Sequence, residues 1–252
     1  MKEVKQIKQA GPVLTSWLLF YALVYAVFHI LPVFLKVEVK SGIRLGDLMD
    51  LSTPLVMVFL VYKLYKILSC QAESALPGTS RQGSKIVLIL GAVIFVEGHG
   101  MHLAANTVNR LIDRSAASKL YELNYFFDEI LGHLLWDGGI VILSIGLIAV
   151  AFKVKNAAGA KPNLRRLVIA SLIYGLTYFI NAIEGQTVML TLPGAVLIPA
   201  AILLLANKKR MELTSHACLL FFVVAYGWAV CLFVLWYWWQ GAFYQFSDLG
   251  WL

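Results

Sequence analysis

Seven apolar runs of about twenty residues constrain the fold of this chain more than any other feature, because a transmembrane helix needs that length to cross a hydrocarbon core. The composition agrees with a membrane protein: 60% of the 252 residues are hydrophobic and only 14% are charged. We therefore predict an all-α, polytopic integral membrane protein with seven transmembrane helices. The expected spans are 13–35, 49–69, 85–106, 127–152, 165–183, 187–206 and 216–240.

Lysine and arginine residues gather in alternate connecting segments, and this asymmetry predicts the orientation of the helices. Cytoplasmic loops of membrane proteins carry an excess of Lys and Arg, so we expect a cytoplasmic N-terminus and an extracytoplasmic C-terminus. The net charge of +7 then comes from a ring of basic residues beside the lipid headgroups of the cytoplasmic leaflet, which we call the cytoplasmic collar. It does not indicate a nucleic-acid-binding surface. The residues assigned to the cytoplasmic face are Lys2, Lys5, Lys8, Lys63, Lys66, Arg81, Lys85, Lys153, Lys155, Lys161, Arg165, Arg166, Lys208, Lys209 and Arg210.

The connecting segments are too short to fold as soluble domains, so we expect residues 1–252 to form a single transmembrane domain. The first apolar run exceeds twenty residues and lacks a clear small-x-small cleavage site, which favours an uncleaved first helix over a signal peptide. Trp236, Trp238 and Trp239 end the last span, where an aromatic belt is expected at the outer interface. This placement supports the predicted topology.

The third span ends in a polar stripe. Ionisable residues at membrane depth are costly and mark candidate functional sites. At 100° per residue, His99, His102 and Asn106 fall on one face of a helix, whereas Glu97 falls nearly opposite His99. The spacing therefore predicts an imidazole face in the outer third of the membrane, with Glu97 directed elsewhere unless the helix is distorted.

The fourth span begins with a matching stripe. Glu129, His133 and Asp137 follow one another at intervals of four residues, which places them on one face of an α-helix. Asp128 points away from this face, so we interpret it as a helix-start charge near the membrane interface. The third and fourth spans thus offer facing imidazole and carboxylate groups at the same end of the bundle.

Imidazole and carboxylate groups at these spacings predict a metal site, with zinc favoured over iron, manganese or copper. The predicted ligands are His99, His102, His133 and Glu129, and the predicted catalytic groups are Glu129 and Asp137. Two other interpretations stay open: a hydrogen-bonded network that only joins helices, and a proton or ion relay without metal. Further candidate members of the site are His29, Asp50, Glu97, Asn106, Asn181 and Glu184.

The motifs that the sequence lacks narrow the reaction. It has no nucleotide-binding loop, dinucleotide fingerprint or serine-hydrolase elbow. A metal-activated water with a carboxylate as proton acceptor is the simplest chemistry for the predicted site, which favours a hydrolase of a lipid or another amphiphilic substrate. The alternatives are a proton- or ion-coupled transporter and a subunit that transfers electrons through haem or copper. A transporter should carry polar residues to the cytoplasmic face, but the inner halves of the spans read as almost uniformly apolar.

In helix number and in its intramembrane His and Asp residues, the chain resembles the superfamily of seven-helix, metal-dependent membrane hydrolases that includes alkaline ceramidases and adiponectin-type receptors. The resemblance covers helix number and residue types without an aligned motif. Those proteins place a His-x-x-x-His pair in their last helix, whereas the last span here has only His216, at its cytoplasmic start.

Overall fold

The computed structural model describes residues 2–75, 82–112, 118–154 and 161–251. Within these residues, seven helical spans are long and apolar enough to cross a membrane, so the predicted all-α, polytopic membrane protein is confirmed. The long helices are α1 (Lys2–Phe34), α3 (Thr53–Ala75), α4 (Gln82–Asn109), α6 (His133–Ala151), α7 (Leu164–Glu184), α8 (Val188–Lys208) and α9 (Ala217–Gln240). The shorter elements are β1 (Glu38–Lys40), β2 (Ile43–Arg44), α2 (Leu45–Asp50), α5 (Ser118–Tyr125), the π-helix η1 (Phe126–Gly132) and the 3₁₀-helix η2 (Leu213–Ser215).

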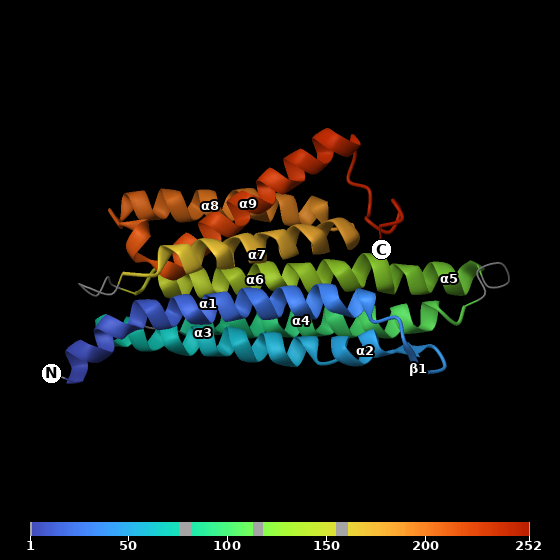
Figure 1. The fold of residues 1–252 in the computed structure, drawn as a ribbon, viewed down its shortest axis with the longest axis horizontal. Helices are drawn as coiled ribbons and strands as arrows, with labels where there is room; N and C mark the ends of the chain where they lie inside the picture. The colour runs from blue at the N-terminus through green and yellow to red at the C-terminus, as the bar shows by residue number, and fades with distance from the viewer. Residues whose placement is uncertain (1, 76–81, 113–117, 155–160, 252) are drawn as a thin grey trace.

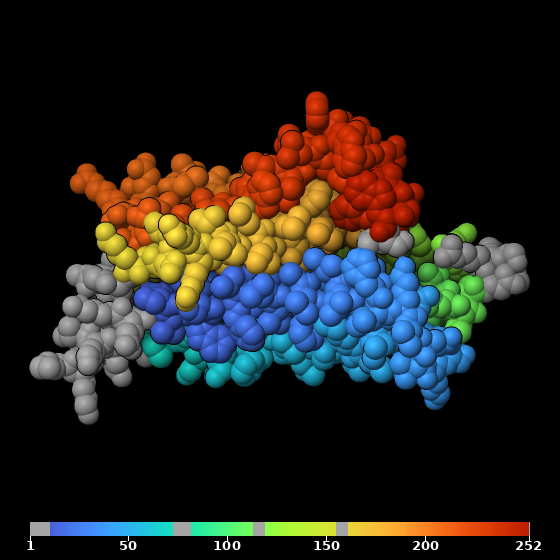
Figure 2. Space-filling model, in the orientation of Figure 1, coloured from blue at the N-terminus to red at the C-terminus, as the bar shows by residue number. Residues whose placement is uncertain are grey.

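The long helices form one bundle, in which α9 crosses the others obliquely (Figure 1). Helices α1, α3, α4 and α6 lie together, and α7 packs against both α1 and α9 (Figure 1). On the face shown in Figure 2, α1 lies between α7 on one side and the α2–α3 segment on the other. The two ends of the chain lie at opposite ends of the bundle (Figure 1), as an odd number of spans requires.

Among the described helices, α4 and α6 share the most extensive contact, and glycine permits it. A Cβ atom at Gly98 would lie 2.3 Å from the backbone nitrogen of Trp136, and one at Gly139 would lie 2.5 Å from the backbone nitrogen of Phe95. Small residues let transmembrane helices approach in this way, because packing and not the hydrophobic effect holds helices together in lipid. The pairing fixes the antiparallel register of α4 and α6.

Aromatic side chains fill the space between α1, α7 and α9. The ring of Tyr174 lies at their centre, with its centroid 4.8 Å from that of Tyr25 and 5.3 Å from that of Phe221. Such pairs add to the dispersion energy of close packing. The largest fully buried aromatic residues are Tyr21, Tyr25, Tyr174, Tyr178, Tyr226, Phe95, Phe221, Phe222 and Phe233.

A short antiparallel hairpin of β1 and β2 lies at one end of the bundle, and hydrogen bonds of Arg110, the residue after α4, attach it there. The Arg110 guanidinium donates two hydrogen bonds of 2.6 Å to the carboxylate of Asp47 and a third, of 3.0 Å, to the carbonyl of Gly42. The hydrogen bonds to Asp47 raise the pKa of Arg110 above its ordinary value. A bidentate pair of this kind holds a fixed geometry, so the hairpin and α2 stay attached to the end of α4.

The structure shifts the approximate boundaries of two predicted segments. The second span was expected to begin at residue 49, but the helical segment begins with α2 at Leu45 and α3 starts only at Thr53, followed by Pro54. Proline fits the first turn of a helix, where no N–H partner is needed. The segment 107–126, expected as a loop, contains the end of α4 and all of α5. Of the residues assigned to the cytoplasmic collar, Arg81 and Lys155 lie outside the described residues.

Candidate functional site

Four histidine rings surround the indole of Trp136, which projects from α6. The centroid distances from Trp136 are 4.3 Å to His99, 5.2 Å to His29, 5.3 Å to His102 and 5.6 Å to His133. The histidines come from α1, α4 and the start of α6. The structure thus brings together the three predicted histidine ligands and His29, with a tryptophan between them that the sequence analysis did not assign to the site.

His99 is completely buried and is held by the end of α2. Its Nε2 lies 3.2 Å from Oδ1 of Asp50 and 3.0 Å from the carbonyl oxygen of the same residue. Thr53 donates a 3.1 Å hydrogen bond to the same carboxylate. This pairing leaves Nδ1 of His99 buried without a partner among the described residues. Asp50, a further candidate in the sequence analysis, is therefore a direct neighbour of a predicted ligand.

His29 lies next to this pair, with its ring centroid 6.4 Å from that of His99. Its Nδ1 is 2.9 Å from the carbonyl oxygen of Tyr25, one helical turn earlier in α1. Its Nε2 is buried and has no partner in the described part of the chain. His29 and His99 thus each have one ring nitrogen engaged and one free.

Asp128 is a site residue that the sequence analysis missed. Its side chain is 1% exposed, and Oδ1 lies 2.8 Å from Nδ1 of His102, although the ring N–H does not point closely enough at the oxygen to form a hydrogen bond. The predicted outward direction of Asp128 is wrong because Phe126–Gly132 is a π-helix. Its i→i+5 pattern turns Asp128 toward the face of His133, five residues later.

His133 and Glu129 remain close together, as their spacing predicted. Nε2 of His133 lies 3.8 Å from Oε2 of Glu129, and the ring centroids of His102 and His133 are 4.3 Å apart. The Glu129 side chain is 26% exposed, in contrast to that of Asp128. The start of α6 and the end of α4 therefore meet in a group of two imidazoles and two carboxylates.

Asp137 has a partner on another helix. Its side chain is buried, and its Oδ2 accepts a short hydrogen bond from the hydroxyl of Thr187, the residue before α8. The sequence analysis placed Asp137 on the stripe of His133 and did not identify Thr187. The carboxylate thus joins α6 to the start of α8.

Of the remaining candidates, Asn181 and Glu184 form hydrogen bonds to residues outside the histidine group, whereas Asn106 and Glu97 do not. The amide of Asn181 donates a 3.3 Å hydrogen bond to the hydroxyl of Tyr25. The carboxylate of Glu184 accepts the backbone N–H groups of Phe246 and Ser247 at 2.9 and 3.3 Å, and its carbonyl accepts a bond from Gln245. Asn106 is half-buried, and Glu97 is exposed on the outer side of α4, as its phase predicted; neither has a partner among the described residues.

The side chains form neighbouring pairs and do not converge on one point. In the described ranges, no three His, Cys, Asp or Glu side chains are arranged as ligands of one ion. The sequence analysis grouped His99 with His102 and His133, whereas the structure pairs His99 with Asp50 and pairs His102 with Asp128. As it stands, the arrangement supplies imidazole–carboxylate pairs, which hold and transfer protons and orient imidazoles for metal binding.

Comparison with known proteins gives a distant similarity. The chain is 25% identical over 207 residues to the human ceroid-lipofuscinosis neuronal protein 6, and 24% identical over 207 residues to its dog homologue. In both comparisons the matched region covers 77% of this chain and 64% of the relative. The chain thus spans somewhat less than two thirds of the length of these curated relatives. No protein-family model and no solved structure matches the chain.

Proposed function

We propose that this chain is a membrane-embedded, metal-dependent enzyme, most simply a hydrolase that acts on a lipid-like substrate at the extracytoplasmic leaflet. One observation carries the proposal. In His29 and His99, one ring nitrogen contacts an oxygen atom of the chain, and the other is buried without a partner among the described residues. His102 and His133 each have one ring nitrogen close to a carboxylate oxygen, at 2.8 and 3.8 Å. Metal-binding histidines have this arrangement, because a hydrogen-bond acceptor on one nitrogen orients the other toward the ion.

The residues that would hold the metal are His102, His133 and Glu129, with His99 as a further ligand. His102 and His133 have the closest rings, and Glu129 is the nearest carboxylate to His133. His99 and His29 each have a buried ring nitrogen without a hydrogen-bond partner among the described residues. Such a nitrogen is energetically unfavourable, and a bound ion or polar group would supply the missing partner. Since these groups do not converge as they stand, binding requires their side chains to turn toward one another.

When bound, the metal would act as a Lewis acid that activates water. Glu129 is the proposed proton acceptor, because its partly exposed carboxylate can take up a proton and release it. Asp137, which the sequence analysis also predicted to be catalytic, is held by Thr187 before the start of α8, and its carboxylate is the proposed second proton acceptor beside Glu129. The indole N–H of Trp136 is buried and has no hydrogen-bond partner among the described residues, and an oxygen atom of a bound ligand that reached it would supply one.

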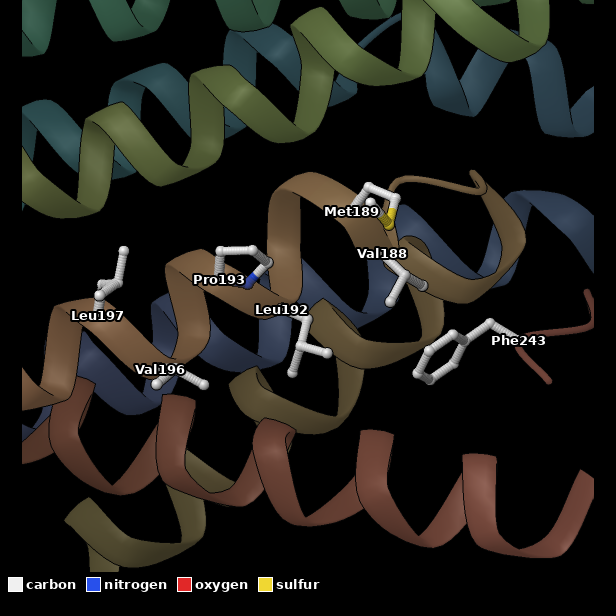
Figure 3. Close-up of a pocket in the computed structure, with 7 residues that line it drawn as sticks. All are labelled: Val188, Met189, Leu192, Pro193, Val196, Leu197 and Phe243. Atoms are coloured by element: carbon white, nitrogen blue, oxygen red, sulfur yellow. The ribbon is translucent and has the colours of Figure 1, made fainter. Parts of the chain in front are cut away.

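A lipid-like substrate is supported by an apolar groove that begins next to the residue bound to Asp137. Thr187 is followed directly by Val188, which lines this groove at the start of α8. The groove has a volume of about 400 Å³, and Figure 3 shows residues of one α8 face with Phe243 from the chain after α9. The lining residues are Val188, Met189, Leu192, Pro193, Val196, Leu197 and Phe243.

The charge asymmetry supports an extracytoplasmic position for the proposed site. The described basic residues assigned to the cytoplasmic face lie at the opposite end of the bundle from these histidines: Lys85 lies in the first turn of α4, whereas His99 and His102 follow in its second half. Under the positive-inside rule, the histidine end then faces outward. A substrate would enter from the outer leaflet.

Metal analysis of the purified protein tests the proposal. We expect bound zinc at about one ion per chain, lost on replacement of His102 or His133 by Ala and reduced in Glu129→Gln, because each substitution removes a ligand. His216→Ala is the matched control, since His216 lies before α9 at the opposite end of the bundle. Elemental analysis is combined with hydrolysis assays on mixed membrane lipids. A metal-free, colourless preparation that hydrolyses lipids at the same rate as a zinc-loaded one would refute metal dependence.

A proton relay is the second candidate, and one observation favours it. Polar groups continue inward from His29: its ring centroid lies 4.3 Å from that of Tyr25, whose ring stacks on Tyr174. The hydroxyl of Tyr174 lies 3.2 Å from that of Ser144. The sequence-based expectation of almost uniformly apolar inner halves overlooked these buried hydroxyls. Proton flux into proteoliposomes that is lost in Tyr174→Phe, without any dependence on metal, would favour the relay over the hydrolase.

A further inference from the structure

Glu97 presents a carboxyl group on the outer surface of the bundle. It is exposed on the side of α4 away from α6, and it has no hydrogen bond or ion pair in the described part of the chain. Large apolar side chains surround it on the same surface: Val93 is 60% exposed and Val96 is 44% exposed. In a transmembrane helix, this surface faces lipid unless another protein covers it.

The depth of Glu97 makes this exposure costly. At 1.5 Å per residue, it lies roughly 18 Å from Lys85 at one end of α4 and about 20 Å from Arg110 at the other, which places it near the middle of the membrane. The close contacts of Gly98 with Trp136 and of Gly139 with Phe95 put Asp137 at the same level. Asp137 is buried and bonded to Thr187, whereas Glu97 has no comparable partner. Carboxyl groups at this depth normally face protein and are paired.

The same face of α4 carries small residues beyond Glu97. Val93, Glu97, Gly100 and Ala104 are spaced by four, three and four residues, so they form one stripe along the helix, and all four are exposed. A Cβ atom at Gly100 would meet nothing within 4 Å. Small residues at this spacing allow the backbone of a second helix to approach closely, and a polar side chain beside them then forms a hydrogen bond across the interface.

We propose that this stripe of α4 is the contact surface for a second copy of the same chain. A carboxyl group suits a twofold interface because, with one proton, it both donates and accepts: the protonated Glu97 of one copy donates its O–H to the carboxylate of the other. In a symmetric pair, the same patch contacts itself, and a crossing at Gly100 brings both carboxyl groups into the interface. The apolar residues of the stripe pack around this bond, which removes both groups from lipid.

The test is the dimer equilibrium of the full chain in phosphatidylcholine vesicles, measured by single-molecule photobleaching over a range of protein-to-lipid ratios. We expect dimers for the unmodified chain. Glu97→Leu should raise the dissociation constant about ten-fold, since a hydrogen bond between membrane helices contributes roughly 1–2 kcal/mol. Glu97→Gln should keep the dimer, because its amide both donates and accepts. Equal melting temperatures of the variants would show that folding is unaffected.

Disulfide crosslinking locates the contact in a background where Cys70, Cys218 and Cys231 are replaced by Ser. Ala104→Cys should crosslink two copies, whereas Leu204→Cys, on the exposed side of α8, should not. A chain that stays monomeric at every protein-to-lipid ratio would overturn the proposal and indicate a different partner with a basic or amide group. A dimer unaffected by Glu97→Leu, or crosslinked equally at both positions, would also refute it.

Discussion

Replacing Gly98 by Ala should separate the two helices that carry most of the candidate site. A Cβ atom at this position would lie 2.3 Å from the backbone nitrogen of Trp136 and 2.7 Å from the carbonyl oxygen of Gly132. Backbone atoms cannot rotate away as a side chain can, so α4 must move outward by about 1 Å to restore ordinary van der Waals contact near 3.4 Å. Overpacking typically costs about 1–3 kcal/mol, and the contact with backbone atoms places Gly98→Ala at the upper end of this range.

Alanine also favours the helix by up to about 1 kcal/mol relative to glycine, so the net expected loss is roughly 2 kcal/mol. Gly227→Ala is the matched control: Gly227 lies inside α9, and a Cβ atom there would meet nothing within 4 Å, so only the favourable contribution remains. Reversible unfolding of both variants in the same detergent gives the two free energies. If Gly98→Ala were as stable as Gly227→Ala, the inferred close packing of α4 and α6 would be wrong.

Three further predictions concern a buried carboxylate, a histidine at the membrane boundary and the topology. Asp137→Asn should fold normally, because the amide oxygen still accepts the hydrogen bond from the Thr187 hydroxyl, but it should lose most activity because the charge is gone. Thr187→Val should instead destabilise the chain by about 1–3 kcal/mol, because it leaves a buried carboxylate without its hydrogen-bond donor. Thermal melting and activity measured on one sample distinguish these outcomes, and full activity of Asp137→Asn would favour a purely structural role. Burial lowers the pKa of His216, so the unfolded state binds the proton more readily and stability should fall as the pH drops below about 6.5. His216→Gln should reduce this loss between pH 7.5 and 5.5, and an unchanged pH dependence of the melting temperature would contradict it. In a cysteine-free chain, Ser247→Cys should react with an impermeant thiol reagent in intact cells while Asn207→Cys stays protected, and the opposite labelling would reverse the proposed orientation.

The spans were predictable because apolar length alone decides whether a helix can cross a membrane. The face of α4 was predictable for a similar reason: α4 is one unbroken helix, so a constant angle per residue places His99 and His102 inward and Glu97 outward. Gly98 lies between these residues in sequence, but the sequence analysis did not predict its close contact with another helix. Its contact with Trp136 depends on which helix packs against α4, and the local sequence does not contain that information.

Asp128 shows why helical phase failed at the start of α6. Assigning side chains to a face requires a known number of residues per turn, and the π-helix changes that number for Phe126–Gly132. A single wider turn is rare and has no firm sequence signature, so a regular α-helix was the natural expectation. Glu129 kept its predicted neighbour His133, whereas Asp128 turned inward to His102. The wider turn thus brings adjacent carboxylates to the two closest imidazoles.

Wider turns of this kind occur often at functional sites, because they persist only where the surrounding structure compensates for the poorer backbone geometry. Here the compensation is local: Gly132 ends the π-helix, and a Cβ atom there would lie 3.1 Å from the backbone nitrogen of His102. The same close approach that allows the wide turn therefore places His102 against Asp128. A purely structural helix junction would need neither the two half-buried imidazoles of His102 and His133 nor the buried indole N–H of Trp136, which has no partner among the described residues. This excess of polar groups without partners is the physical reason to look for a ligand at this end of the bundle.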